Sequence, residues 1–247
     1  MAPEVLLSPL HRADGSATYT QNGYSIIGAV NGPIEVLRKD ELPSEATLEV
    51  HVRPAVGVGS PKERHLETLL TSTLRSIILT HHLPRTLIQL TLQVRSIPAE
   101  DAICGVSAYL TLLPHLINTS LLSLLSSSIP LRTTVTAALV VSPTSSPTMP
   151  LVMPTAQEIL RAGRIKHAHV FAFDGERKMV VCESEGSFTF EEWEEAWEVA
   201  EDVCCRDGGV GLGEAMQVDG QSENLEGWLR EVVRRKVEGE QRWKSGT

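Results

Sequence analysis

A two-residue turn near the start of the chain constrains the fold more than any other feature. Asn22-Gly23 separates two strand-like runs, 16–21 and 24–30. Both residues tolerate the positive φ of a type I′ turn, whose backbone matches the twist of two paired strands. The sequence therefore predicts an antiparallel hairpin, and Asp14-Gly15-Ser16 immediately before it is interpreted as part of this scaffold rather than as a catalytic motif.

Further strands and helices follow from hydrophobic period and capping signals. Alternation or β-branched content predicts strands at 47–53, 87–94, 133–141, 166–173 and 178–183. Ser60, Pro61 and Glu63 supply the cap, first position and capping box of a helix, and Thr189 with Glu192 supplies a second capping box. We also expect a deeply buried helix at 106–128, with Pro114 near a kink or boundary, and a last helix at 225–243.

This order of elements predicts a single α+β domain of mixed sheets and helices over residues 1–205. Residues 206–222 are rich in glycine and predict a flexible linker or insertion. A C-terminal helical segment, 223–247, completes the expected organisation.

The acidity of the chain is concentrated in one segment. The net charge is −9, from 31 acidic and 22 basic residues, and residues 183–202 hold nine acids without any Lys or Arg. The remainder is balanced, with 22 residues of each sign. Because a phosphate backbone responds to the local field, the overall acidity does not exclude an RNA-binding surface elsewhere.

Cysteine usage and hydropathy indicate an intracellular protein. The four cysteines are scattered and form no C-x-x-C pair, a pattern that predicts reduced thiols. They are Cys104, Cys182, Cys204 and Cys205. No signal peptide is expected at the N-terminus. The most apolar stretch, 110–131, contains proline, histidine, asparagine and several serines, so we expect a core helix and no association with a membrane.

Several phrases, in this order, resemble the RNase PH family. They are RADGSA, TQNGYSIIGAVNGPIEV, ATLEVHVRPAVGVGSPKERHLETLL, LPRTLIQLTLQV, SSSIPLRTTVTAALVV and PLVMPTAQEILRAGRIKHAHVFAF. Within the family the likeness is to ring subunits of the eukaryotic RNA exosome. The resemblance implies pairing with a partner of the same fold inside a hexameric ring that threads single-stranded RNA. It further implies other RNase PH-like ring subunits, RNA-binding cap subunits and an associated processive nuclease as partners, in the nucleus, nucleolus and cytoplasm.

The residues that the family uses for phosphorolysis are missing from the matching places. The family binds phosphate with Gly-Thr-Arg-Thr at the start of its buried helix, whereas residues 111–114 here are Thr-Leu-Leu-Pro, with Leu113 in place of the arginine. No Lys or Arg lies between Arg95 and Arg132. The family's acidic pair has no counterpart either, because Glu158 is the sole acid between Asp101 and Asp174. We therefore predict no catalytic residue, no cofactor and no phosphorolytic activity.

Basic residues around two predicted strands are the candidate RNA contacts. We predict contacts from Arg53, Lys62, Arg64, Arg85 and Arg95. Lys62 and Arg64 lie in the first turn of a helix, where cations oppose the dipole, so free amides and basic side chains of the loop 53–64 can together hold a phosphate. The alternative is a solvated surface in which Glu63 and Glu67 neighbour the basic groups. In the family this loop approaches the channel, which favours RNA contact.

Other residues with possible chemistry have simpler interpretations. His167 and His169 share one face of a strand, but no third ligand has metal-binding spacing, so we predict no metal site and two ordinary core or surface histidines. Cys204 and Cys205 lie on the acidic helix, where we expect glutamates to raise their pKa.

Two functions remain open from the sequence. The first is a non-catalytic exosome ring subunit that supports 3′-to-5′ RNA processing by associated nucleases. The second is a free-standing or homodimeric nuclease with weak hydrolytic or phosphorolytic activity, carried by residues that no motif identifies.

Overall fold

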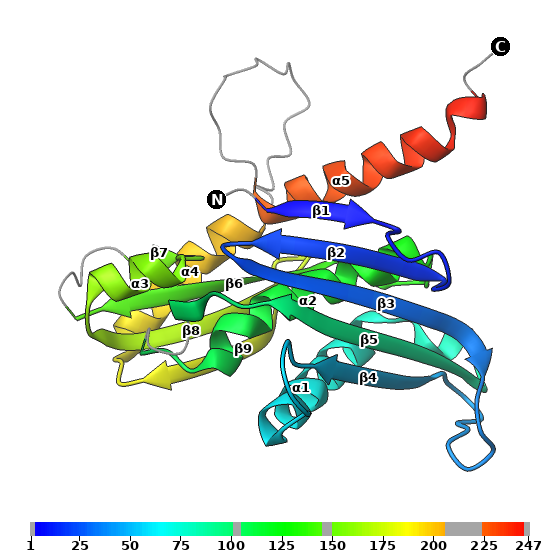
Figure 1. The fold of residues 1–247 in the computed structure, drawn as a ribbon, viewed down its shortest axis with the longest axis horizontal. Helices are drawn as coiled ribbons and strands as arrows, with labels where there is room; N and C mark the ends of the chain where they lie inside the picture. Colours follow the sequence, from blue (N-terminus) through cyan, green and yellow to red (C-terminus); the bar gives the residue numbers. More distant parts are fainter. Residues whose placement is uncertain (1–2, 101–104, 145–149, 206–223, 245–247) are drawn as a thin grey trace.

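The computed structural model describes residues 3–100, 105–144, 150–205 and 224–244. Two sheets pack around a central helix, and further helices cover them from outside (Figure 1). The expected α+β class is confirmed. The linker predicted at 206–222 and Cys104 lie outside the described residues.

The first sheet contains the predicted hairpin. Its strands are β1 (Glu4–Leu7), β2 (Gly15–Gln21), β3 (Tyr24–Glu35), β4 (Thr47–Arg53) and β5 (Thr86–Ser96), in the order β1-β2-β3-β5-β4. Gln21 pairs with Tyr24 across the turn, in which Asn22 and Gly23 have φ of 54° and 87°. β4 runs parallel to β5, and the other neighbours are antiparallel. The hairpin prediction is confirmed, and β1 adds an edge strand that the sequence did not indicate.

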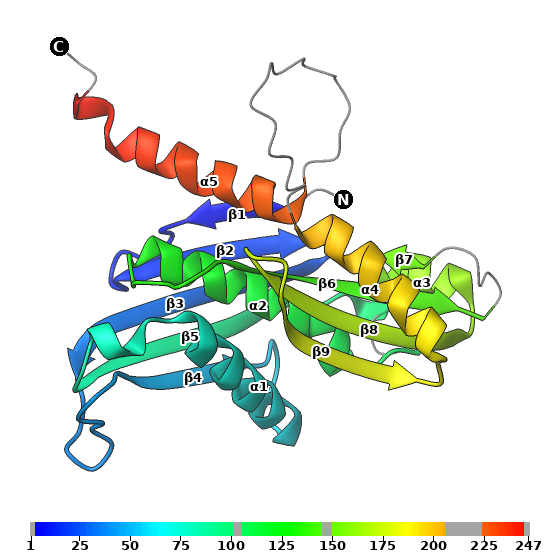
Figure 2. The ribbon, with the colours of Figure 1, turned by 180° about the vertical axis from the view of Figure 1, so that it is seen from behind.

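The second sheet is antiparallel throughout. Its strands are β6 (Val135–Pro143), β7 (Leu151–Val152), β8 (Ile165–Asp174) and β9 (Met179–Gly186), in the order β7-β6-β8-β9. The helices are α1 (Pro61–Ile77), α2 (Ala108–Ser126), α3 (Ala156–Ala162), α4 (Phe190–Cys204) and α5 (Leu225–Glu240), with 3₁₀ turns at Thr80–His82 and Arg242–Lys244. α4 covers the outward face of β6 and β8, seen best in Figure 2.

The central helix α2 is buried despite its many polar side chains. Its hydroxyl groups donate to carbonyls one turn earlier, as Thr119 does to His115 at 2.7 Å and Ser123 to Thr119 at 2.8 Å. Such bonds satisfy a buried hydroxyl without an outside partner. α2 is the one described helix with the length and mean hydropathy of a membrane span, and 83% of its apolar window is buried within the protein. The prediction of a core helix is confirmed, although Pro114 lies inside it.

The C-terminal helix packs onto the first sheet and α2. Leu225 and Leu229 are buried in a cluster with Ala17, Tyr19 and Leu121. The predicted helix is therefore present, ending at Glu240, and its first two turns share a core with β2. Val233 still packs against this cluster and Lys236 donates to the Ser126 hydroxyl at 3.0 Å, and the end of the helix extends away from the sheet (Figure 1).

Candidate nucleic-acid interface

The parallel pairing of β4 with β5 brings most of the predicted basic residues to one end of the first sheet. Arg53 pairs with Gln93, so Arg53 at the end of β4 and Arg95 near the end of β5 lie at the same edge. The chain then forms one loop and enters α1, which carries Lys62 and Arg64 in its first turns. Arg53, Lys62 and Arg95 are exposed, and none of them has an ion pair within the described part of the chain. We call these four residues, Arg53, Lys62, Arg64 and Arg95, the basic end.

Arg85 does not join this group. It precedes β5 and therefore lies at the opposite end of the strand, eight residues from Gln93, or about 26 Å at the usual rise of a strand. Its guanidinium pairs with Glu41 at 3.4 Å. The sequence analysis named Arg85 together with Arg95 because both flank one predicted strand. They flank it at opposite ends, so in the structure they lie far apart.

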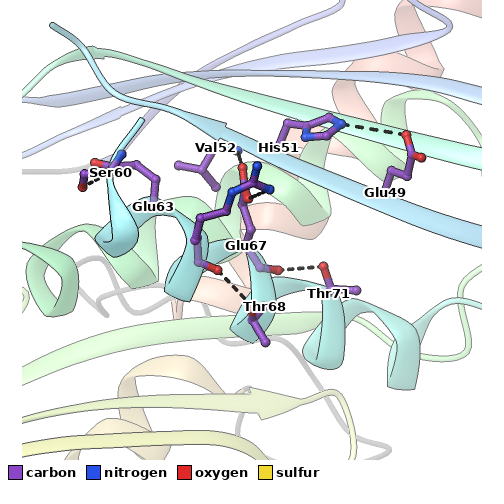
Figure 3. A network of polar contacts seen from close by, with 9 residues as sticks. Glu49, His51, Val52, Ser60, Glu63, Glu67, Thr68 and Thr71 are labelled. Carbon is purple, nitrogen blue, oxygen red and sulfur yellow. Dashed lines mark hydrogen bonds and ion pairs between the residues drawn. The ribbon is translucent and has the colours of Figure 1, made fainter. Parts of the chain in front are cut away.

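The start of α1 is closed by its own side chains. The Ser60 hydroxyl accepts a hydrogen bond from the Lys62 amide at 3.3 Å, and Glu63 accepts one from the Ser60 amide at 2.6 Å and another from its hydroxyl (Figure 3). The predicted capping box is confirmed. It also places a carboxylate where a phosphate would approach the helix amides. The expectation that free amides help to hold phosphate is therefore wrong for these groups, and RNA contact would depend on the basic side chains.

Glu67 ties α1 to the edge of the sheet. One carboxylate oxygen accepts the Val52 amide of β4 at 2.9 Å, and the other binds the Arg64 guanidinium at 3.1 Å (Figure 3). The ion pair restrains Arg64, although its side chain stays 81% exposed. As a surface pair it contributes about 0 to 1 kcal/mol, so Arg64 can exchange Glu67 for a phosphate at little cost.

A groove of about 680 Å³ lies beside the basic end. Its floor is the outward face of β4 and β5, with His51, Gln89, Thr91 and Gln93, and the loop before α1 forms a wall. Arg53 and Arg64 line the same groove. Sequence reasoning selected the charged residues and missed this polar floor, which the strict alternation of 87–94 would have assigned to the exposed face.

The start of α2, which the sequence analysis compares with the family's phosphate turn, is apolar and contacts a carboxylate. Leu112 and Leu113 are buried in the first turns of α2. Just before them, Ser107 donates both its amide (3.0 Å) and its hydroxyl (2.7 Å) to Glu185 of β9. A phosphate at this helix start would meet leucine side chains and a negative charge. Glu185 was not identified from the sequence, since its contact with Ser107 spans 78 residues.

Glu158, which the sequence analysis compares with the family's acidic pair, forms a helix cap. Glu158 accepts the Thr155 amide at 2.8 Å, while its own amide donates to the Thr155 hydroxyl at 3.2 Å, so the pair forms the capping box of α3. These hydrogen bonds to Thr155 lower the pKa of the exposed Glu158 carboxyl.

His167 and His169 belong to the core beneath α4. They are buried and hydrogen-bonded to each other at 2.9 Å, and His169 also contacts the Ser184 hydroxyl at 2.7 Å. Burial, reinforced by His167, lowers the pKa of His169 to about 4. The described residues contain no group of three His, Cys, Asp or Glu that could hold a metal ion.

The two neighbouring thiols are buried at the end of α4. The pKa of Cys204 is raised by burial first and by Cys205 second, and that of Cys205 rises to about 11, again chiefly through burial with Glu201 adding to it. The predicted direction is correct. Its assigned cause is corrected, because removal from water outweighs the acidic helix.

The comparison with protein families decides the identity of the fold. The model of the 3′ exoribonuclease family, domain 1 (RNase PH), matches residues 4–130, just over half of the chain. The chain belongs to the RNase PH family. The matched part holds the first sheet, α1 and α2, and therefore includes both the basic end and the capped helix start of this RNase PH domain.

Two named relatives and one solved structure are similar to this chain. The Saccharomyces cerevisiae exosome complex component RRP46 is 29% identical over 208 residues, covering 83% of this chain and 91% of the relative. The Schizosaccharomyces pombe exosome complex component rrp46 is 34% identical over 123 residues, half of each chain. The crystal structure of rice (Oryza sativa) Rrp46 superposes with a TM-score of 0.67 at 26% identity, covering 80% of this chain and 86% of that one.

Proposed function

We propose that this RNase PH domain is a ring subunit of an RNA exosome and contributes assembly and RNA contact instead of a cleavage site. The single observation that supports the proposal is the start of α2, the region that the sequence analysis compares with the family's phosphate turn, where Leu112 and Leu113 are buried and Ser107 is hydrogen-bonded to Glu185. A dianion cannot be held there without a cation, because burial of an unpaired charge costs several kcal/mol. The likeness to RRP46 over 91% of that relative supports the exosome as its context.

The proposed partners follow from this context. The chain would pair with other RNase PH-like ring subunits, together with RNA-binding caps and a processive nuclease that performs the chemistry. Its place would be the nucleus and nucleolus, and also the cytoplasm. Single-stranded RNA would pass the basic end, where Arg53, Lys62, Arg64 and Arg95 would neutralise phosphates.

Assembly and activity can be tested together. We expect native mass spectrometry of the endogenous complex to show the chain in stoichiometric association with related RNase PH-fold chains. We expect the purified chain to release no nucleoside diphosphates from single-stranded RNA supplied with phosphate and Mg²⁺. Robust degradation that is lost in Glu158→Gln or Glu185→Gln would instead establish the free-standing nuclease.

Removing charge at the basic end is expected to weaken RNA binding. The triple variant Arg53→Ala, Lys62→Ala, Arg64→Ala should bind single-stranded RNA about tenfold less tightly. The negative slope of log K against log salt should become less steep by about 2, since each lost phosphate contact contributes about 0.7. Arg85→Ala is the matched control, because Arg85 is basic but lies at the far end of β5. If the triple variant assembles normally and its affinity for RNA and its crosslinking to RNA are both unchanged, these residues do not contact RNA.

A further inference from the structure

The groove beside the basic end has an unusual floor for a nucleic-acid site. In the first sheet, α1 and α2 pack on one face, and no described helix covers the other, which carries the outward side chains of β4 and β5 (Figure 1). His51 lies opposite Thr91, and Arg53 opposite Gln93, so two polar rows cross the floor. None of the residues that line the groove is Phe, Tyr or Trp. The floor therefore offers no Phe, Tyr or Trp on which a base could stack, and His51 is the one aromatic ring among the residues that line it.

Gln93 presents a fixed hydrogen-bond acceptor to the groove. Its side-chain nitrogen donates to the carbonyl of Pro54 at 3.0 Å and to that of Val94 at 2.8 Å. These two bonds use both amide hydrogens and determine which way the amide is turned. The remaining polar atom, Oε1, has no hydrogen-bond partner among the described residues. It is an acceptor held in place before any ligand arrives.

Thr91 places a second group on the same floor. Its side chain lines the groove two residues before Gln93 on β5, so both point to the same face of the sheet. No described residue forms a hydrogen bond with its hydroxyl. A hydroxyl can donate or accept, and together with Gln93 Oε1 it matches a ligand group that does both.

The rim supplies the charge that would position such a ligand. Arg53 and Arg64 line the groove beside this floor. The two carboxylates in the wall are already bound, Glu63 by the Ser60 amide and Glu67 by the Val52 amide and Arg64. A nucleotide whose phosphate meets the arginines would bring its sugar within reach of the hydrogen-bonding groups of the floor.

We propose that Thr91 and Gln93 recognise the ribose 2′-hydroxyl, so that the groove distinguishes RNA from DNA. The inference rests on the proposed function, because the basic end must first hold the phosphates. The 2′-hydroxyl donates its hydrogen to Gln93 Oε1, and its oxygen accepts a hydrogen bond from the Thr91 hydroxyl. A 2′-hydroxyl is the group by which a protein can tell the two backbones apart at a given site.

Three oligonucleotides of one sequence test the proposal with the full-length chain. The probes are a fluorescent 12-nucleotide oligouridine, its 2′-deoxy form and its 2′-O-methyl form. We expect the ribose form to bind about fivefold or more tightly than the deoxy form, as the loss of one or two hydrogen bonds implies. The 2′-O-methyl form keeps an acceptor but cannot donate, so it should bind like the deoxy form. Equal binding of the ribose and 2′-O-methyl forms would overturn the role of Gln93.

Variants separate this proposal from the RNA surface on which it rests. Thr91→Val with Gln93→Met should lower the affinity for the ribose form to that for the deoxy form and leave deoxy binding unchanged. Thr18→Val on β2 serves as the control for a threonine of the same sheet, and melting temperatures confirm folding. The triple variant of the basic end should weaken both forms equally. If it weakens neither, the proposed RNA surface fails; if the unaltered chain binds both forms equally, ribose recognition alone fails.

Discussion

Replacing Gly15 by alanine is expected to lower the free energy of unfolding by about 3 kcal/mol. A Cβ at this position would lie 2.4 Å from both the amide nitrogen and the Cβ of Ser127, and 2.6 Å from its Cα. These are largely backbone atoms at the end of α2, so relief requires the helix to move away from β2. Overpacking of this kind costs about 1 to 3 kcal/mol and occasionally more. Urea unfolding followed by circular dichroism measures the loss.

Gly59→Ala is the matched control for this glycine. A Cβ at Gly59 meets nothing within 4 Å, and we expect a change within about 0.5 kcal/mol. If Gly15→Ala were as mild as Gly59→Ala, the close approach of β2 to α2 would not be required by the fold.

The effect at Gly15 also explains the motif that surrounds it. Asp14 accepts the Gly32 amide at 2.8 Å, and the Ser16 hydroxyl accepts the Leu10 amide at 3.0 Å. Each member of Asp14-Gly15-Ser16 therefore fixes part of the chain around the hairpin. The interpretation of this motif as scaffold is supported by its contacts.

Asn118→Leu is expected to destabilise the protein by about 3 kcal/mol or more. Its side chain donates to the Ala137 carbonyl at 3.2 Å and accepts the Ala137 amide at 3.0 Å. β7 pairs only with Val140 and Val141, so β6 has no strand on that side at Ala137, and Asn118 takes the place of one. Leucine leaves both backbone groups buried without a partner, at about 1 to 3 kcal/mol each.

Thr119→Val provides the comparison for Asn118 on the same helix. The Thr119 hydroxyl is equally buried but bonds only to a carbonyl of its own helix, so we expect a loss of about 1 kcal/mol. Chemical denaturation of both variants under the same conditions measures the difference. Equal losses would show that α2 is joined to β6 by packing alone.

Local signals predicted most of the secondary structure. The Asn22-Gly23 turn and the capping box at Ser60 depend on residues only a few positions apart, and both are present. β1, β7 and α3 were missed because short segments have too few residues to show a period. The two strands pair with longer ones, β1 with β2 and β7 with β6.

Long-range register limited the prediction of the site. Nothing local to Arg53 or Arg95 shows that β4 runs parallel to β5, and this pairing brings the two residues to the same end of the sheet. In the same way, Glu185 reaches Ser107 only because β9 passes the start of α2. Residue types were therefore enough to select candidate residues, whereas the contacts that each of them makes required the folded chain.

The hydrogen bond from Val52 to Glu67 has a consequence for how neighbours can approach. β4 is the outermost strand on its side of the sheet, and such strands readily recruit an extended segment from another molecule. Glu67 occupies the Val52 amide on that margin, so an incoming strand could pair with this amide only if Glu67 moved away. The same carboxylate also holds Arg64, so displacing it would release a basic side chain next to the groove.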